Sequence, residues 1–449
     1  FKDLYVDGVA YTDAIGFGST AMTLPTADGS SGQMLTTNGD GALSWAAANS
    51  GTSVDGLSDG LVETNSVYIG NDPSGTTNTA QYNVAIGTTA LDAITTGDEN
   101  TAIGKDALTN NTTGTSNVAI GYEALRDNVS DVGNVGIGKS ALQESKGGEY
   151  NTAVGNNALR GTTDTHITGD ENVAIGAGSM KFNIAGAMNS AVGRSSLYTN
   201  TSGSNNTALG YQSLNLNTTG DNNTASGYKS LYANTTGTRN LAIGYSAYDN
   251  ADTENDNLAI GYDALGGAID GGEYNIAIGN YTMDANTTGD RNTATGYSSL
   301  TGNTTGSDNT AYGYASLSNN TTGNFNDAFG YQSLKLNTTG EYNTAMGMWA
   351  LAANTAGNYN TGSGYRALVS TTTGDRNTAL GSTAGDVITT GGNNVMLGWG
   401  TDPSAADGVN QIMIGYTATG HGNNIAVIGN TDMTAWHPAD DGGVDLGSG

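Results

Sequence analysis

N-T-A-L-G-Y-Q-S-L-N-L-N-T-T-G-D-N-N, the stretch from Asn206 to Asn223, decides the fold of this chain of 449 residues. Counted from Asn206, it reads Asn, a variable residue, Ala208, an apolar residue, Gly210, two variable residues, a small residue and Leu214, followed by a corner that ends in Gly220. The next lead Asn follows seventeen residues later. The period, more than any single residue, carries the structural information.

The lead Asn recurs every seventeen residues except at the steps Asn151 to Asn172 and Asn257 to Asn275, which are twenty-one and eighteen residues long. We read these two steps as insertions and expect residues 156–171 and 266–274 to form lateral loops. Such strict self-similarity predicts a solenoid, whose coils bury their apolar face only by stacking on one another. Gly stands four residues after the lead Asn in all eighteen copies, which begin at Asn83, Asn100, Asn117, Asn134, Asn151, Asn172, Asn189, Asn206, Asn223, Asn240, Asn257, Asn275, Asn292, Asn309, Asn326, Asn343, Asn360 and Asn377.

Composition agrees with a β- and turn-rich rod. The chain has 69 Gly, 4 Pro and only 12% charged residues, and Pro25, Pro73, Pro403 and Pro438 all lie outside the span from Asn83 to Asn394. Pro lacks the N–H that a strand paired on both sides must donate. A helical repeat is disfavoured, because Gly costs about 1 kcal/mol per helix-interior site.

Charge and cysteine usage exclude several classes of function. The formal net charge is -28, which argues against nucleic-acid partners and anionic membrane surfaces. The chain has no Cys, so disulfides and thiolate sites are ruled out, and it has no run of about 20 apolar residues that would insert into a membrane.

Each coil is expected to hold two short strands. The first is Asn206–Gly210, with Ala208 on a crowded inner face, and the second carries Leu214 into the lumen. Gly220 is expected to turn the corner with a positive φ, and stacked Asn side chains are expected to form an amide ladder. At about 4.8 Å per coil, roughly twenty coils predict a rod on the order of 100 Å long.

The frame divides the chain into five parts. We expect a small β connector at residues 1–64, a degenerate first coil at 65–82, the regular array at 83–393, worn terminal coils at 394–430 and a second connector at 431–449. The chain begins at Phe1, without Met, and we expect it to be a piece of a longer fibre.

Tyrosines occupy the position after the fixed Gly in nine copies, four of which, Tyr211, Tyr228, Tyr245 and Tyr262, are consecutive. Such a surface ladder suits either a carbohydrate platform or ring stacking along the rod, and aromatic packing favours the second interpretation.

The chain offers few candidate catalytic or metal-binding residues, and the sequence predicts neither an enzyme nor a cofactor or metal site. His166, His421 and His437 have no nucleophile motif beside them, and we expect each to be an ordinary surface residue. Acidic residues follow the corner Gly in several copies, as at Asp98 and Asp221, but they lack the pattern of calcium β-rolls and suit a solvated face. The N-T-T sequons, as at Asn217 and Asn303, are explained by the turn.

The repeats N-T-A-I-G-K-D-A-L (Asn100 to Leu108) and N-V-A-I-G-Y-E-A-L (Asn117 to Leu125) resemble the YadA-like head repeats of trimeric autotransporter adhesins, which also occur in phage tail fibres. The resemblance covers roughly Asn65 to Gly429 and implies a left-handed parallel β-roll with three chains side by side. This chain departs from the family by a longer repeat with an added Asn-Thr-Thr-Gly corner. The end segments Met22–Trp45 and Trp436–Gly449 resemble connectors of phage tail fibres.

The main functional hypothesis is a non-enzymatic, homotrimeric tail-fibre shaft or receptor-binding fibre, located on the virion. Its expected partners are itself, other fibre or virion proteins, and a host surface receptor, with glycans among the candidates. The alternative is a bacterial cell-surface adhesin or extracellular filament subunit. A third hypothesis, ice binding by Thr-Thr columns, is weak because the Thr pairs sit at a Gly corner.

Overall fold

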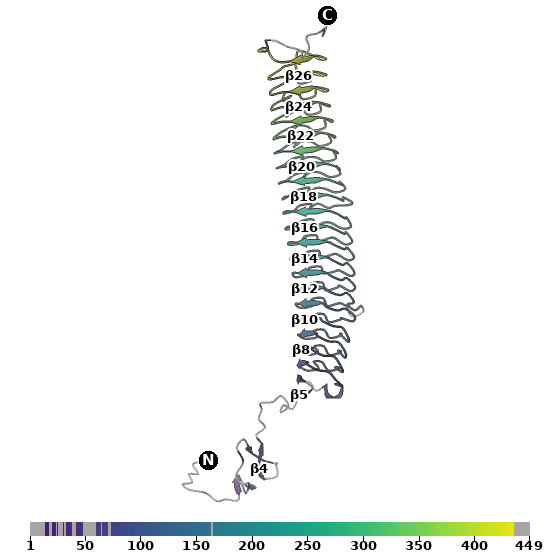
Figure 1. The fold of residues 1–449 in the computed structure, drawn as a ribbon, viewed down its shortest axis with the longest axis vertical. Helices are drawn as coiled ribbons and strands as arrows, with labels where there is room; N and C mark the ends of the chain where they lie inside the picture. The colour runs from purple at the N-terminus through teal and green to yellow at the C-terminus, as the bar shows by residue number, and fades with distance from the viewer. Residues whose placement is uncertain are drawn as a thin grey trace, which may run out of the picture.

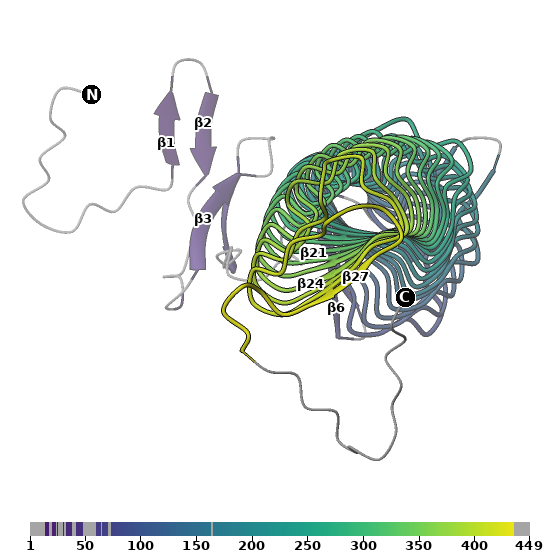
Figure 2. The same cartoon turned by 90° about the horizontal axis from the view of Figure 1, so that it is seen from above.

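The computed structural model describes residues 14–17, 20–23, 25, 30, 33–37, 42–47, 60–63, 65–70, 73–162 and 165–434. From β6 onward the chain is a straight rod of stacked coils (Figure 1), a parallel β-solenoid of about 21 turns with a spacing of about 17 residues. Seen along the axis, the coils superimpose while rotating gradually (Figure 2). The predicted all-β solenoid is confirmed, and the described residues contain only one short helical turn, η2 (Pro73–Gly75).

Each coil contributes one strand, of four residues in the first coil and three in the others, to a single sheet that runs the length of the rod. The strands are β6 (Ser66–Ile69), β7 (Val84–Ile86), β8 (Thr101–Ile103), β9 (Val118–Ile120), β10 (Val135–Ile137), β11 (Thr152–Val154), β12 (Val173–Ile175), β13 (Ser190–Val192), β14 (Thr207–Leu209), β15 (Thr224–Ser226), β16 (Leu241–Ile243), β17 (Leu258–Ile260), β18 (Ile276–Ile278), β19 (Thr293–Thr295), β20 (Thr310–Tyr312), β21 (Asp327–Phe329), β22 (Thr344–Met346), β23 (Thr361–Ser363), β24 (Thr378–Leu380), β25 (Val395–Leu397), β26 (Ile412–Ile414) and β27 (Ala426–Ile428).

Equivalent residues of successive coils lie directly over one another. Ala208 of β14 pairs with Ala191 of β13 and with Ala225 of β15, in parallel register. These alanines are almost completely buried, so the inner face of the sheet is as crowded as the sequence predicts. Each strand from β6 to β26 is paired on both sides, which explains why Pro is absent from the array.

The prediction of a second strand in each coil is wrong, because the segment around Leu214 is a series of turns. Gln212 and Leu214 have φ of 55° and 50°, a left-handed conformation that is uncommon for residues with a Cβ. Stacking offsets this cost, since the Leu214 N–H donates to the Ser230 carbonyl at 2.9 Å and the Leu side chain is fully buried. Leu214 therefore fills the lumen, as predicted, but from a bend.

The role expected of Gly220 is also corrected, because the positive φ belongs to Gly210, at 136°. A Cβ at Gly210 would lie 2.7 Å from the Gly227 carbonyl carbon, so the position needs Gly for both reasons. Gly220 does not have a positive φ. It is fixed by close approach, since a Cβ there would collide with the Gly237 carbonyl oxygen and would lie 2.5 Å from Asn217 Oδ1.

The predicted amide ladder is confirmed, and it is double. Asn223 Nδ2 donates to Asn206 Oδ1 of the preceding coil at 3.1 Å and to the Gly237 carbonyl at 2.8 Å. Its Oδ1 accepts the Asn240 backbone N–H at 3.0 Å. A second ladder runs through the corner, where Asn217 Nδ2 donates to Asn200 Oδ1 at 2.8 Å. The Asn223 amide is thus satisfied by the coils above and below. In the corner ladder, Asn128 and the Oδ1 atoms of Asn234 and Asn354 are buried without a hydrogen-bond partner.

The irregular coils use buried carboxylates where the corner ladder is interrupted. Asp131 takes the place of a corner Gly, and its Oδ1 accepts the Gly147 backbone N–H at 2.8 Å while its Oδ2 accepts the Ser145 hydroxyl at 2.9 Å. Glu254 occupies the equivalent place before the second long step, and its Oε1 accepts the Gly271 N–H at 3.1 Å. In each case the acidic side chain reaches forward to the next coil, which for Glu254 is the irregular coil that begins at Asn257.

The ends of the array differ from its middle. At the N-terminal end β5 (Gly60–Glu63) pairs antiparallel with β6. Further upstream, within the expected connector 1–64, two antiparallel hairpins are described: β1 (Ala14–Phe17) with β2 (Thr20–Thr23), and β3 (Gln33–Thr37) with β4 (Leu43–Ala47). The expectations for residues 1–13 and for most of the connector 431–449 lie outside the described residues.

Candidate functional site: the surface columns of the rod

The tyrosine ladder predicted from the sequence exists. The rings of Tyr211 and Tyr228 have their centroids 5.4 Å apart, those of Tyr228 and Tyr245 4.8 Å, and those of Tyr245 and Tyr262 5.2 Å. Their planes are tilted by only 12°, 10° and 7°, respectively. The rings sit beside the fixed Gly of each coil, so the period that stacks the glycines also stacks the tyrosines.

The ladder continues beyond Tyr262. Tyr281 contacts Tyr262 edge-on at 5.3 Å, and the stacked arrangement resumes at Tyr297 and Tyr314, 5.4 Å apart. Together these form an unbroken series of ring contacts that we call the aromatic column: Tyr211, Tyr228, Tyr245, Tyr262, Tyr281, Tyr297, Tyr314, Tyr331, Trp349 and Tyr365. Tyr281 stands two residues after the fixed Gly279, one position later in its coil than the other tyrosines, and its contacts on both sides are edge-on.

Stacking determines which part of each ring is accessible. Tyr228 and Tyr245 are 38% and 49% exposed, but the neighbouring rings cover much of their faces. Sugar rings bound by aromatic residues normally lie against ring faces, and here mainly ring edges and hydroxyls meet the solvent. The geometry therefore favours the packing interpretation of the ladder over a carbohydrate platform.

A second aromatic column was missed by the sequence analysis. It lies one residue before the lead Asn, where Phe325, Tyr342 and Tyr359 stack with centroids 4.9 Å apart at both steps. Their spacing of seventeen residues was the available signal. Upstream the same position holds ion pairs between coils, in which Arg239 donates to Asp256 and Arg291 to Asp308, at 2.6 and 2.8 Å.

The N-terminal coils present cations where the later coils present tyrosines. Lys105 and Lys139 flank Tyr122 in this surface position, each with its ammonium 5.8 Å from the ring centroid. Arg194 is the last cation of the series, with its guanidinium 5.9 Å from the centroid of Tyr211, where the aromatic column begins. Cation–π contacts thus join the two kinds of surface.

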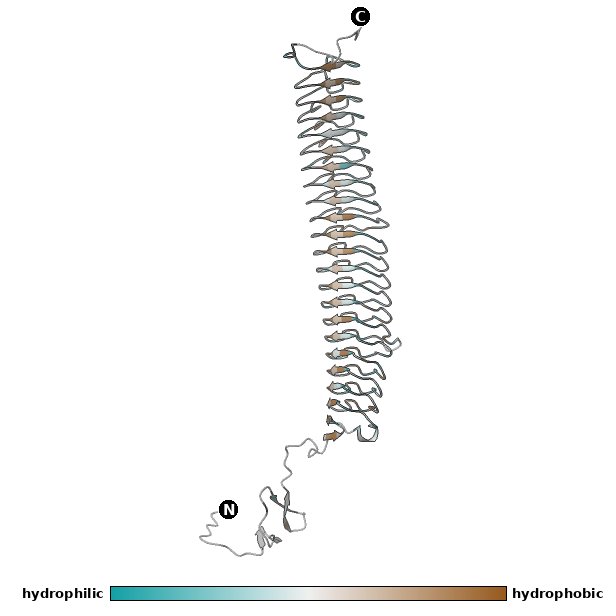
Figure 3. Ribbon diagram, viewed as in Figure 1, coloured by the Kyte–Doolittle hydropathy of each residue, from teal (hydrophilic) through white to brown (hydrophobic). Residues whose placement is uncertain are grey.

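The outer face of the sheet is apolar in most coils and is exposed. Ile243, Ile276 and Ile278 are 41%, 39% and 38% exposed, and Leu209 is 51% exposed. Most strand arrows carry brown in Figure 3, where brown marks hydrophobic residues. The apolar strip is interrupted at β15, β19 and β23, whose outer residues are Thr or Ser. Large exposed apolar patches are uncommon on monomeric soluble proteins.

The acidic column has a backbone partner that the sequence analysis did not foresee. Asp98 Oδ1 accepts the Gln81 backbone N–H at 2.7 Å, Asp221 Oδ1 accepts that of Ser204 at 2.7 Å, and Asp375 Oδ1 accepts that of Asn358 at 2.7 Å. Each carboxylate therefore ties its coil to the preceding one, a structural use that needs no cation.

Asp127, Glu144 and His166 form the one group among the described residues whose spacing suits a metal ion. Arg126 already donates to both carboxylates, at 2.8 and 3.1 Å, and Lys146 Nζ lies 3.2 Å from His166 Nε2. Burial and the neighbouring Asp127 raise the pKa of Glu144. Two cations thus neutralise the group, which acts as an ion-pair network under the first insertion.

The N-T-T sequons at Asn217 and Asn303 are closed to modification. Asn217 and Asn303 are fully buried, and their Nδ2 atoms donate to the corner carbonyls of Gly220 and Gly306 at 3.0 and 2.8 Å. A glycan cannot be attached to these nitrogens while the coil is folded.

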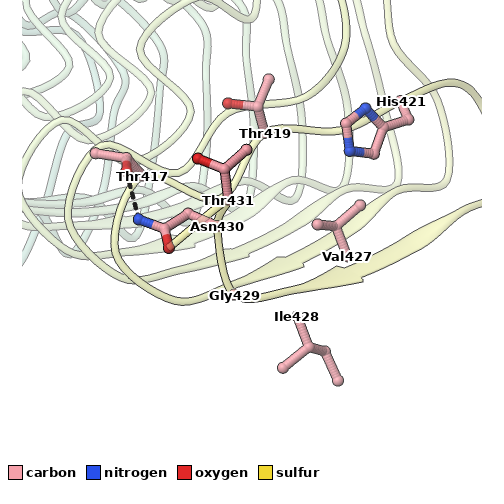
Figure 4. Close-up of a pocket in the computed structure, with 8 residues that line it drawn as sticks. All are labelled: Thr417, Thr419, His421, Val427, Ile428, Gly429, Asn430 and Thr431. Carbon is pink, nitrogen blue, oxygen red and sulfur yellow. Dashed lines mark hydrogen bonds between the residues drawn. The ribbon is translucent and has the colours of Figure 1, made fainter. Parts of the chain in front are cut away.

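A shallow pocket of about 410 Å³ lies at the last coils. Figure 4 shows its lining, in which the Asn430 amide donates to the Thr417 hydroxyl at 3.3 Å and Ile428 points away from the other side chains. His421 borders this pocket, His166 lies in the ion-pair network, and His437 lies outside the described residues. The pocket shows no grouping of a nucleophile with a base.

No helix within the described parts of the chain has the length and apolar character needed to cross a membrane. Comparison with models of known protein families gives no match, and the curated proteins give none either.

Proposed function

We propose that the protein is a non-enzymatic structural fibre that presents its exterior at a distance from the body to which it is attached. One observation supports the proposal above all: the interior side chains of each coil serve to stack it on its neighbours, and Ala208, Leu214 and the Asn206 amide are all buried. The variation between coils is greatest in the outer columns, while the interior admits a few replacements such as Met180 and Tyr248. A rod of this kind supplies length and a repeating surface, and its coils depend on their neighbours for stability.

The proposal includes a homotrimer of rods packed side by side through the outer face of the sheet. Ile243, Ile278 and their equivalents form an exposed apolar strip that a second and third copy would cover. The strip runs parallel to the axis, so identical rods aligned in register would bury it along their whole length. Handedness follows the YadA-like resemblance in this proposal and is expected to be left-handed.

The trimer is tested by measuring the mass of the purified chain in solution by sedimentation and by native mass spectrometry. We expect three chains for the wild type and one for the double variant Ile243→Asp/Ile278→Asp, which places charges in the proposed interface. Thr219→Asp/Thr288→Asp, which places two charges at exposed corner positions away from the sheet, is the matched control and should leave the mass unchanged. A folded wild-type monomer would overturn the trimer.

We place the fibre on a virion, as a tail-fibre shaft or receptor-binding protein. The support is the rod architecture together with the resemblance of the end segments to fibre connectors. Its partners would then be other fibre or virion proteins and a host surface receptor. The bacterial cell-surface adhesin is the competing assignment, because a long rod with an exposed aromatic surface serves either role.

Electron microscopy with gold-labelled antibodies against the rod separates the two assignments. Label on the tails of virus particles is the expected result. Label on the bacterial envelope in cells free of virus would establish the adhesin instead and overturn the virion assignment. Antibodies against the hairpin residues 33–47 and against the C-terminal coils would also give the orientation of the rod.

A further inference from the structure

We propose that the stacked tyrosines are sites of oxidative cross-linking, at which peroxide and a haem peroxidase join neighbouring coils through dityrosine bonds. The chemistry requires two phenol rings held close together, accessible to an oxidant, and without a faster reductant nearby. The rod meets each requirement with groups on its surface.

The first requirement is met by six pairs of stacked tyrosines, each one coil apart. Their ring centroids are 4.8 to 5.4 Å apart, with interplanar angles of 1° to 12°. Parallel register places equivalent carbons of the two rings over one another, and this includes the carbons next to the hydroxyl. The pairs are Tyr211–Tyr228, Tyr228–Tyr245, Tyr245–Tyr262, Tyr297–Tyr314, Tyr314–Tyr331 and Tyr342–Tyr359.

The second and third requirements follow from exposure and composition. Tyr228 is 38% and Tyr245 49% exposed, so both rings are accessible to an oxidant in the solvent. The chain contains no Cys, so no thiol of the protein can reduce a tyrosyl radical. The buried interior, in contrast, is packed with Ala and Leu and takes no part.

The reaction balances with hydrogen peroxide as the oxidant. Each of two tyrosines gives one electron to the peroxidase and its phenolic proton to water, which leaves two radicals. The radicals couple through a carbon–carbon bond between the ring positions next to the hydroxyls, and the hydrogens displaced there restore the two hydroxyl groups. The two electrons and two protons convert one peroxide molecule into two water molecules.

The array contains its own controls. Phe325 stacks on Tyr342 at 4.9 Å and 10°, the same geometry, but Phe has no phenol and cannot form the bond. Tyr232 lies on the rod surface, with the Lys229 ammonium 5.2 Å from its ring centroid. Among the described residues, no other aromatic ring contacts Tyr232. Accessibility to an oxidant alone would modify Tyr232 as well, because it is partly exposed.

Trypsin digestion followed by mass spectrometry reads the cross-links directly. Lys229 and Arg239 lie between Tyr228 and Tyr245, so a bond between these tyrosines joins peptide 195–229 to peptide 240–291. We expect this linked peptide after brief treatment of the full chain with peroxidase and hydrogen peroxide. We also expect dityrosine fluorescence in the fraction whose chains still migrate singly in denaturing gels.

Tyr228→Phe keeps the stack but removes one phenol, and it should abolish the linkage between these two peptides while leaving the circular dichroism spectrum unchanged. Tyr232→Phe should leave the linkage intact. The proposal is overturned if Tyr232 enters cross-links as often as Tyr228, if bonds between different chains dominate, or if the linked peptide persists in Tyr228→Phe.

Discussion

The coils from Asn100 to Tyr198 and the coils from Asn206 to Tyr365 share one interior and differ in their exteriors. Leu108 and Leu214 are both fully buried, and Asn100 and Asn206 make the same amide contacts. On the surface, the first region carries cations beside the fixed Gly, and the second carries the aromatic column. Stacking fixes the inside of every coil, whereas the outside is free to vary, so the properties that distinguish the two regions must be sought on the surface.

A side chain at the fixed Gly is expected to cause the largest loss of stability, and the loss should be the same in both regions. We expect Gly227→Val to destabilise the rod by about 3 kcal/mol or more, because φ at this position is 139° and the new Cβ would lie 2.7 Å from the Gly244 carbonyl carbon. Urea unfolding followed by circular dichroism measures the loss. Gly121→Val in the first region should cost the same within error, since its φ is 137°.

Ser226→Val is the matched control for this prediction. Ser226 lies next to Gly227 on the outer face of the sheet, where neighbouring coils carry Leu209 and Ile243. The free energy of unfolding of Ser226→Val should differ from that of the wild type by less than about 0.5 kcal/mol, as for other surface substitutions. Equal losses for Ser226→Val and Gly227→Val would show that the interior is not the determinant of the stack.

The amide ladder gives the next largest effect. Asn223→Ala should cost about 1–3 kcal/mol, because the Asn240 N–H and the Gly237 carbonyl would each lose a buried partner. Thermal unfolding of the variant measures this loss. Asn319→Ala is the control, since Asn319 is exposed, and it should be close to neutral. A neutral Asn223→Ala would mean that water replaces the ladder.

These interior positions were readable from the sequence because the period itself requires them to stack. Ala208, Leu214 and Asn206 were all placed in the coil correctly, and their burial needs no knowledge of the backbone path. The two errors concern conformation: the bend at Leu214 and the site of positive φ at Gly210. Both depend on hydrogen bonds to the next coil, which local propensity does not report.

The degenerate terminal coils are expected to differ from the regular coils in the pH dependence of their stability. Burial raises the pKa of Asp402 to about 6, with Asp386 adding to the effect, and Asp402 Oδ1 is buried without a hydrogen-bond partner. The charged form is thus less favourable in the folded protein than in the unfolded chain. Stability is retained at acidic pH and falls as pH rises from about 4 through about 6.

Asp402→Asn should therefore stabilise the terminal coils at pH 7 by about 1 kcal/mol, reduced from the full effect by partial exposure, and should make no difference at pH 3. Hydrogen exchange of the amides of β26 and β27 at the two pH values measures the change. Asp407→Asn, at an exposed position, is the control. A gain of the same size at both pH values would contradict the assignment.

The smallest effect is expected on the surface. Tyr245→Ser removes two ring contacts from the aromatic column and should cost about 1 kcal/mol, because exposure of half the ring keeps each contact near the lower end of the about 0.5–1.5 kcal/mol that aromatic pairs contribute. Urea unfolding alongside Asn223→Ala makes the ranking measurable. A cost above that of Asn223→Ala would make the column a structural element of the rod.

The sequence by itself determined that coils of seventeen residues stack, that Ala, Leu and Asn face inward, and that tyrosines align along the axis. A fixed period forces equivalent residues over one another whatever path the chain takes between them. Only the tertiary structure decided that each coil has a single strand, that the ring edges rather than the faces of the tyrosines meet solvent, and that the acidic residues hold backbone amides of the preceding coil. These features are set by contacts between coils, and such contacts exist only once the chain has stacked.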